Sequence, residues 1–163
     1  MNGIVFKPIG VIHTPYDNTG DMPIQPPAGK GIKGMVEVYP EYADGLKDLD
    51  GFSHIILLYQ FHLSKGFQLE VRPFLDDKKR GLFSTRAPRR PNSIGLSVVR
   101  LCSVEKNILY IENVDMVNNT PLLDIKPYVP DFEKIEDIKT GWLSAVKHKL
   151  LKMKSDDRFD ADF

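Results

Sequence analysis

Apolar and polar residues along the first four fifths of this 163-residue chain follow the patterns of β-strands. Residues 35–39 alternate between apolar and polar and stop at a proline, whereas 52–61 is almost continuously apolar. Alternation indicates a half-buried strand, and a continuous apolar run indicates a strand covered on both faces. Further strand-like runs lie at 6–13, 69–74, 94–101, 108–114 and 122–128.

Six or seven short strands at near-regular spacing, without long helical patterns between them, favour a barrel or sandwich over a doubly wound sheet. A short helix is predicted near 40–49 and a second near 131–153, where apolar residues recur every three or four positions. Residues 15–33 form a proline- and glycine-rich loop of a length that is usually functional or mobile. We therefore predict a mainly β protein with a single closed or nearly closed barrel of about seven short strands.

The composition fits one domain in a reducing compartment. The length is sufficient for a core without disulfides, and a single cysteine, Cys102, excludes an internal one. No signal peptide is visible, and the longest apolar run, at 55–59, is too short to span a bilayer. We expect a cytoplasmic protein with a barrel domain at 1–154 and a frayed acidic tail at 155–163.

Charge is zero overall but unevenly distributed, because residues 76–90 hold six basic residues against two aspartates. Such a patch can hold phosphates locally, although a charge run is more often a solvated face. Pro88, within it, and Pro91, directly after it, keep the chain extended around three arginines, whose planar guanidinium groups suit anions. The basic residues of the patch are Lys78, Lys79, Arg80, Arg86, Arg89 and Arg90.

Several motifs bear on possible chemistry. Glycines at 29, 31 and 34 match a dinucleotide-binding pattern by letter, but the strand before them and the helix after them are missing. No zinc-finger spacing occurs, so we expect no metal. His62, at the end of the long apolar run, can reach a ligand, whereas His54 is interpreted as a core histidine. Asp115, before a turn, either bonds backbone amides or binds a ribose or an amine.

Four blocks of the chain together resemble one family. Residues 86–97, R-A-P-R-R-P-N-S-I-G-L-S, are similar to its signature, and 9–16, 49–55 and 124–130 match three further blocks in the same order. The family is the TsaA-like (YaeB-like) group, which includes tRNA methyltransferase O. Bacterial members often carry a further C-terminal domain, which is not seen in this chain.

The resemblance implies a β-barrel that binds S-adenosylmethionine, works as a homodimer and methylates N6 of N6-threonylcarbamoyladenosine at position 37 of tRNA. It implies neither a membrane nor DNA as partner. The loop at 23–25 is a weak match, because the family usually has Pro-Arg-Gln where this chain has Pro-Ile-Gln. By motif, the implied cofactor contacts are Pro23, Ile24, Gln25, His62, Leu63, Arg86, Leu96, Glu112, Asn113, Val114 and Asp115.

Methyl transfer of this kind needs the proton of a weakly nucleophilic nitrogen to be removed or hydrogen-bonded, and His62 and Asp115 are the catalytic candidates. Arg86 is expected to pair with a carboxylate of the cofactor or of the modified base. The phosphates of the tRNA anticodon loop are assigned to Lys78, Lys79, Arg80, Arg89 and Arg90. Three alternatives remain: another acceptor, a non-catalytic module that binds cofactor or RNA, and a structural barrel with solvated arginines.

Overall fold

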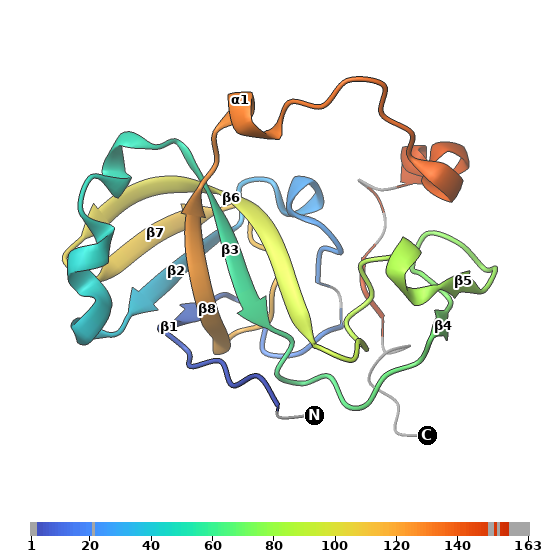
Figure 1. The fold of residues 1–163 in the computed structure, drawn as a ribbon, viewed down its shortest axis with the longest axis horizontal. Coiled ribbons are helices and arrows are strands. Elements are labelled where there is room, and N and C mark those ends of the chain that lie inside the picture. The colour runs from blue at the N-terminus through green and yellow to red at the C-terminus, as the bar shows by residue number, and fades with distance from the viewer. Residues whose placement is uncertain (1–2, 21, 150–151, 153, 157–163) are drawn as a thin grey trace.

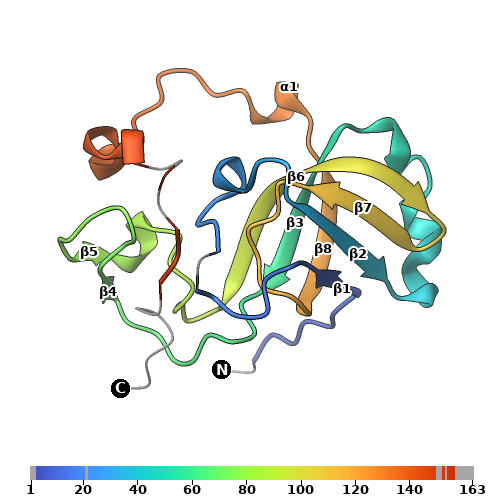
Figure 2. The same cartoon turned by 180° about the vertical axis from the view of Figure 1, so that it is seen from behind.

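Six antiparallel strands close into a barrel in the order β1-β2-β7-β6-β3-β8 (Figures 1 and 2). The computed structural model describes residues 3–20, 22–149, 152 and 154–156. The barrel strands are β1 Gly10–His13, β2 Lys33–Val38, β3 His54–Gln60, β6 Ile94–Glu105, β7 Ile108–Glu112 and β8 Thr120–Pro127. Closure pairs each of these six strands on both sides, which protects their edges. The predicted mainly β barrel is confirmed, with six strands in the barrel.

The remaining two strands stand outside the barrel. β4, Glu70–Val71, pairs with β5, Arg80–Gly81, in a separate two-stranded sheet. We call residues 69–90 the β4–β5 lobe; it has a small core of its own around Val71, Leu82 and Ala87. A strand is expected over 69–74, but β4 is only two residues long. Pro73 cannot donate a ladder hydrogen bond, which limits the pairing. The lobe follows β3 and precedes β6 in the sequence, and it stands beside the barrel in space (Figure 1).

Alternation along β3 builds the barrel core. Ile55, Leu57 and Tyr59 are buried, and the residues between them are half-buried on the outer face. β3 pairs along its whole length with β6, which places Tyr59 opposite Gly95. A Cβ at Gly95 would overlap the Tyr59 ring, so only glycine fits beside this tyrosine.

The predicted helices have different outcomes. The short helix near 40–49 is confirmed as two 3₁₀ segments, Pro40–Leu46 and Leu49–Gly51, whose leucines are buried in the barrel core. The helix predicted near 131–153 is wrong. Only α1, Pro130–Glu133, is α-helical among the described residues there, and 3₁₀ segments follow at Gly141–Ala145 and Lys147–Lys149.

The absence of a continuous helix has a physical cause in the apolar residues. Phe132, Ile135 and Ile138 are 80%, 70% and 69% exposed, so no core within the described part of the chain covers them. A short helix without tertiary packing is marginal in water. Gly141 also adopts a φ of 54°, which ends any right-handed helix at that point. Residues 150, 151 and 153 of the predicted helix lie outside the described residues.

The start of the predicted acidic tail is held in the structure. Ser155 is buried and hydrogen-bonded to Met22, while 157–163 lie outside the described residues. Within the described part of the chain, no helix has the length and apolar character of a membrane span.

Candidate functional site

A cavity of about 310 Å³ opens at the end of the barrel where β3 ends and β6 begins. Its walls come from the loop around residues 22–25, the end of β3, the β4–β5 lobe and the turn before β8. The volume is within the usual range for small-molecule sites, roughly 300–1,000 Å³. Eight of the eleven implied cofactor contacts line this cavity: Pro23, Ile24, Gln25, His62, Leu63, Arg86, Leu96 and Asp115.

The other three implied contacts lie elsewhere. The Glu112 carboxylate lies 3.5 Å from Arg100, across the β6–β7 pair. Asn113 borders a neighbouring groove and has a φ of 68°, and its Oδ1 accepts the amide of Gly31. Val114 is fully buried in the core, so its side chain cannot reach a ligand in the cavity.

The position of Val114 also explains why residues 29 and 34, two of the glycines that match a dinucleotide-binding pattern by letter, are glycines. A Cβ on Gly29 would lie 2.5 Å from the Val114 carbonyl oxygen, and one on Gly34 would lie 2.7 Å from the Val114 side chain. These glycines therefore allow the chain to pack closely over Val114, which agrees with the rejection of a phosphate-binding loop.

Asp115 forms the polar floor of the cavity. Its carboxylate accepts a 2.6 Å hydrogen bond from Ser97 Oγ, and the Tyr59 hydroxyl lies 3.0 Å from the same Oγ. Burial raises the pKa of Asp115 to about 7, although the Ser97 hydrogen bond and the Arg86 charge both oppose the shift. Burial and the neighbouring Asp115 charge also raise the pKa of Tyr59.

Ser97 and Tyr59 were missed as site residues. Ser97 carried a detectable signal, because it is a polar residue at a buried position of the alternating strand β6. Tyr59 was hidden in the apolar run of β3, where a buried tyrosine hydroxyl still needs a hydrogen-bond partner. Together with Asp115 they form a hydrogen-bonded row that leads from the barrel core to the cavity.

His62 lies on the wall of the cavity, shortly after the end of β3. Its Nδ1 is 3.5 Å from Thr120 Oγ1. Partial burial lowers the pKa of His62, so its imidazole is neutral near neutral pH and available to accept a proton.

Arg86 connects two walls of the cavity. Its exposed guanidinium belongs to the β4–β5 lobe and donates a 3.1 Å hydrogen bond to Gln25 Oε1 on the facing loop. Arg86 also borders the neighbouring groove. A ligand carboxylate at this position would meet a donor already held in place.

The five residues assigned to tRNA phosphates do not form one exposed patch. Lys78 and Lys79 are exposed, but Arg89 is only 6% exposed. Arg80 is paired with Asp76 at 2.6 Å. Arg90 lines the cavity beside Arg86, and its Nη1 donates to the carbonyl oxygens of residues 85 and 87. In this arrangement the two lysines are the members best placed to meet a phosphate backbone.

The described residues offer no cluster of side chains that could bind a metal ion. No group of three histidine, cysteine, aspartate or glutamate side chains among them could hold an ion. The donor set of the cavity instead suits an organic ligand with both charges. A guanidinium faces one side, a buried carboxylate forms the floor, and apolar side chains such as Leu63 and Leu96 border the rest.

A closed six-strand barrel with such a cavity at one end defines a class of β-barrel binding domain. Residues 11–134 match the family described as tRNA-methyltransferase O N-terminal domain, and the chain belongs to this family. The TsaA-like resemblance is thereby confirmed.

Three similar proteins illustrate the family. A probable S-adenosyl-L-methionine-binding protein of Pyrococcus abyssi is 53% identical over 156 residues, which cover 96% of this chain and 85% of that protein. The tRNA (adenine(37)-N6)-methyltransferase of Escherichia coli is 36% identical over 152 residues, which cover 87% and 65%. The crystal structure of TrmO from Pseudomonas aeruginosa matches with a TM-score of 0.72 at 34% identity, covering 86% and 63%. The chain thus spans just under two thirds of the last two proteins.

Proposed function

We propose that this protein is an S-adenosylmethionine-dependent methyltransferase that acts on N6 of N6-threonylcarbamoyladenosine at position 37 of tRNA, in the cytoplasm. One observation carries the proposal: eight implied cofactor contacts, distant in sequence, surround a single cavity. The names of the relatives support the two parts of the proposal separately. The Pyrococcus relative is named for the cofactor, and the Escherichia coli relative is named for the reaction.

The chemistry of the cavity fits the proposed cofactor. Arg86 is placed to pair with its carboxylate, or with the threonyl carboxylate of the modified base. A cationic ligand near the buried Asp115 would favour the ionised carboxylate and reduce the unfavourable burial of its charge. Leu63 and Leu96 offer apolar surface to a planar ring.

The proposed reaction divides into positioning and proton transfer. S-adenosylmethionine, when bound, supplies an electrophilic methyl group. The acceptor nitrogen would gain this methyl group as the S–CH3 bond breaks and its electron pair stays on the sulfur of the departing thioether. The nitrogen would also lose its proton, so a basic atom must lie nearby. Two side chains of the cavity can accept this proton. Partial burial lowers the pKa of His62, which keeps its ring neutral near pH 7, and the raised pKa of Asp115, about 7, leaves its carboxylate partly ionised there. A low-dielectric floor strengthens either interaction.

The acceptor is proposed to approach from the side of the β4–β5 lobe. Lys78 and Lys79 are exposed there and can hold phosphates of the anticodon loop. A base in a single-stranded loop can enter a pocket without breaking a base pair.

A homodimer is also proposed. Six of the exposed large apolar side chains lie on two segments outside the barrel, and such patches commonly mark protein interfaces. They are Ile4, Val5, Phe6, Phe132, Ile135 and Ile138. Sedimentation analysis checks this part, and a monomer at all concentrations would contradict it.

A second candidate is a protein that binds the cofactor without this transfer, or that methylates another acceptor. The Pyrococcus relative, named for binding alone, supports it. The deciding experiment incubates the protein with labelled S-adenosylmethionine and tRNA that carries the threonylcarbamoyl group, with unmodified tRNA as control. Label in the modified nucleoside supports the main proposal. Cofactor binding without label in any such tRNA would favour the second candidate.

A further inference from the structure

The segment that follows residue 140 contacts two separate walls of the cavity. Figures 1 and 2 show the chain after α1 crossing from the barrel to the β4–β5 lobe. Residues 154–156 then lie against the loop around Met22. We call the described residues of 141–156 the C-terminal strap.

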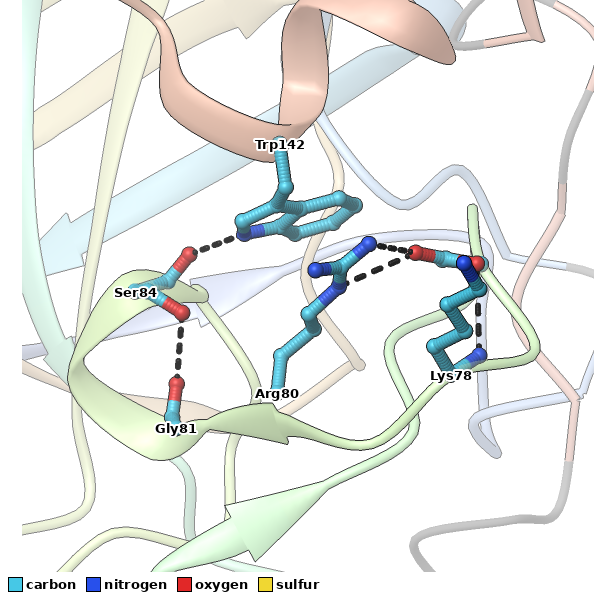
Figure 3. A network of polar contacts seen from close by, with 6 residues as sticks. Lys78, Arg80, Gly81, Ser84 and Trp142 are labelled. Atoms are coloured by element: carbon cyan, nitrogen blue, oxygen red, sulfur yellow. Dashed lines mark hydrogen bonds and ion pairs between the residues drawn. The ribbon is translucent and has the colours of Figure 1, made fainter.

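Trp142 forms the first anchor of the strap, on the β4–β5 lobe. Its indole Nε1 donates a 2.8 Å hydrogen bond to the Ser84 carbonyl oxygen. The Arg80 guanidinium lies 5.3 Å from the indole ring centroid, within cation–π distance. Arg80 is itself held by Asp76, through hydrogen bonds of 2.6 and 3.0 Å (Figure 3). The Ser84 carbonyl that Trp142 binds therefore lies two residues before Arg86, on the segment that supplies one wall of the cavity.

Ser155 forms the second anchor, on the loop that supplies the facing wall. It is only 7% exposed, and its backbone amide donates a 2.8 Å hydrogen bond to the Met22 carbonyl oxygen. Its hydroxyl oxygen accepts the Met22 amide at 3.1 Å and is placed to donate to the carbonyl oxygen of Met22 or of Thr19. Lys154 adds an antiparallel bridge to Pro23. The strap thus adds a short extended segment to the loop that carries Pro23 and Gln25.

The two anchors hold walls that form the cavity together. Ser155 and Asp156 also line the cavity themselves. The loop at 15–33 is long and proline-rich, so ordering it only on binding would lower ligand affinity. An anchor that orders the loop beforehand removes part of that loss.

We propose that Trp142 and Ser155 are positioning residues of the cofactor site, which hold Arg86 and Gln25 in facing positions before the ligand arrives. The strap then orders the walls of the site, whereas the sequence predicts a frayed tail from residue 155. This inference rests on the proposed function, because it takes S-adenosylmethionine to be the ligand of the cavity.

Hydrogen exchange of the ligand-free protein tests the anchor at Ser155. In Ser155→Ala, the amides of residues 19, 20, 22, 24 and 25 are expected to exchange faster, because the hydroxyl that accepts the Met22 amide is gone. The control Ser144→Ala removes an exposed hydroxyl from the same strap, one that is hydrogen-bonded to the nearby Thr140 side chain. Unchanged exchange of the barrel strands shows that the fold is intact. Wild-type exchange of these five loop amides in Ser155→Ala would overturn the inference.

Calorimetric titration with S-adenosylmethionine tests the effect on binding. Loss of a part-buried hydrogen bond predicts about three- to tenfold weaker binding for Ser155→Ala. Trp142→Phe keeps a ring but lacks the indole N–H, and because the bond to Ser84 is exposed a smaller loss, about two- to threefold, is expected. Ser144→Ala is expected to bind like wild type. Wild-type affinity in both anchor variants would overturn the inference while the proposed function stands. No binding by the wild-type protein would refute the proposed function, and the exchange result alone would then decide whether the strap orders the loop.

Discussion

The wild-type protein is expected to become less stable as the pH rises, because Asp115 ionises. Asp115→Asn is expected to abolish this pH-dependent loss. Burial raises the pKa of Asp115 from its ordinary 3.8 to about 7, so the folded state binds this proton more tightly than the unfolded state does. Stability from this group is therefore fully present below pH 3.8 and declines until the pH passes about 7. Asparagine cannot ionise, and its Oδ1 can still accept the Ser97 hydroxyl.

The size of the effect follows from the shift. A difference of about three pKa units corresponds to about 4 kcal/mol in the free energy of unfolding, at roughly 1.36 kcal/mol per unit. The Ser97 hydrogen bond and the Arg86 charge are already included in the raised value, since both favour the ionised form.

Urea unfolding at a series of pH values, from about pH 4 to 8, measures this effect in wild type and Asp115→Asn. The difference in free energy of unfolding, variant minus wild type, is expected to grow by several kcal/mol with rising pH. Taking the difference cancels the contributions of the other titrating groups. Asp124→Asn, which alters a half-buried carboxylate paired with Lys126, is the matched control.

A difference that stays constant across this pH range would contradict a raised pKa of Asp115 in the folded protein. It would show that Asp115 ionises in the folded protein as it does in the unfolded chain. Its proposed role as a proton acceptor near neutral pH would then lose its physical basis, and His62 would be the remaining candidate.

The other predictions concern packing, the cofactor and RNA. Gly95→Ala is expected to destabilise the fold by about 1–3 kcal/mol in urea unfolding, because the new Cβ overlaps an aromatic ring, whereas Gly45→Ala, with open space around it, is not. Arg86→Ala is expected to weaken S-adenosylmethionine binding by about 10- to 100-fold in calorimetry, and unchanged affinity would remove Arg86 from the site. Loss of Lys78 and Lys79 is expected to reduce the salt dependence of tRNA binding by about one unit of slope each, and an unchanged slope would place the RNA elsewhere.

Most of the barrel could be predicted from local pattern. The outer face of β3 is only half-buried and not covered as its continuous apolar run predicts. The structure nevertheless places residues 35–38 in β2 and 54–60 in β3, with Val36, Val38, Ile55, Leu57 and Tyr59 buried. This success has a simple reason, because the barrel interior demands an apolar residue at every second position. The pairing order of the strands could not be read from the pattern, since it depends on contacts between distant segments.

The C-terminal region shows where periodicity misleads. Helical spacing of apolar residues predicts a helix only if a partner surface covers them, and Phe132, Ile135 and Ile138 have none among the described residues. Trp142 is instead held by its indole N–H and by a cation over its ring, which no spacing rule describes.

Only part of the candidate site could be predicted, because motifs identify some of its residues but not how distant segments pack. His62, Arg86 and Asp115 were found through motifs, and the structure brings them to one cavity. Arg89 was assigned to phosphates by its charge, but its burial depends on the packing of the whole lobe. Ser155 was assigned to a tail by composition, and its buried position is set by a loop more than a hundred residues earlier.

A crystal structure of the protein with S-adenosylmethionine tests the central claim most directly. The cofactor is expected in the cavity between the loop at 22–25 and the β4–β5 lobe, with Arg86 near its carboxylate and Asp115 beneath it. A cofactor bound at another surface, or a cavity that stays free of it at saturating concentration, would show that this cavity is not the cofactor site.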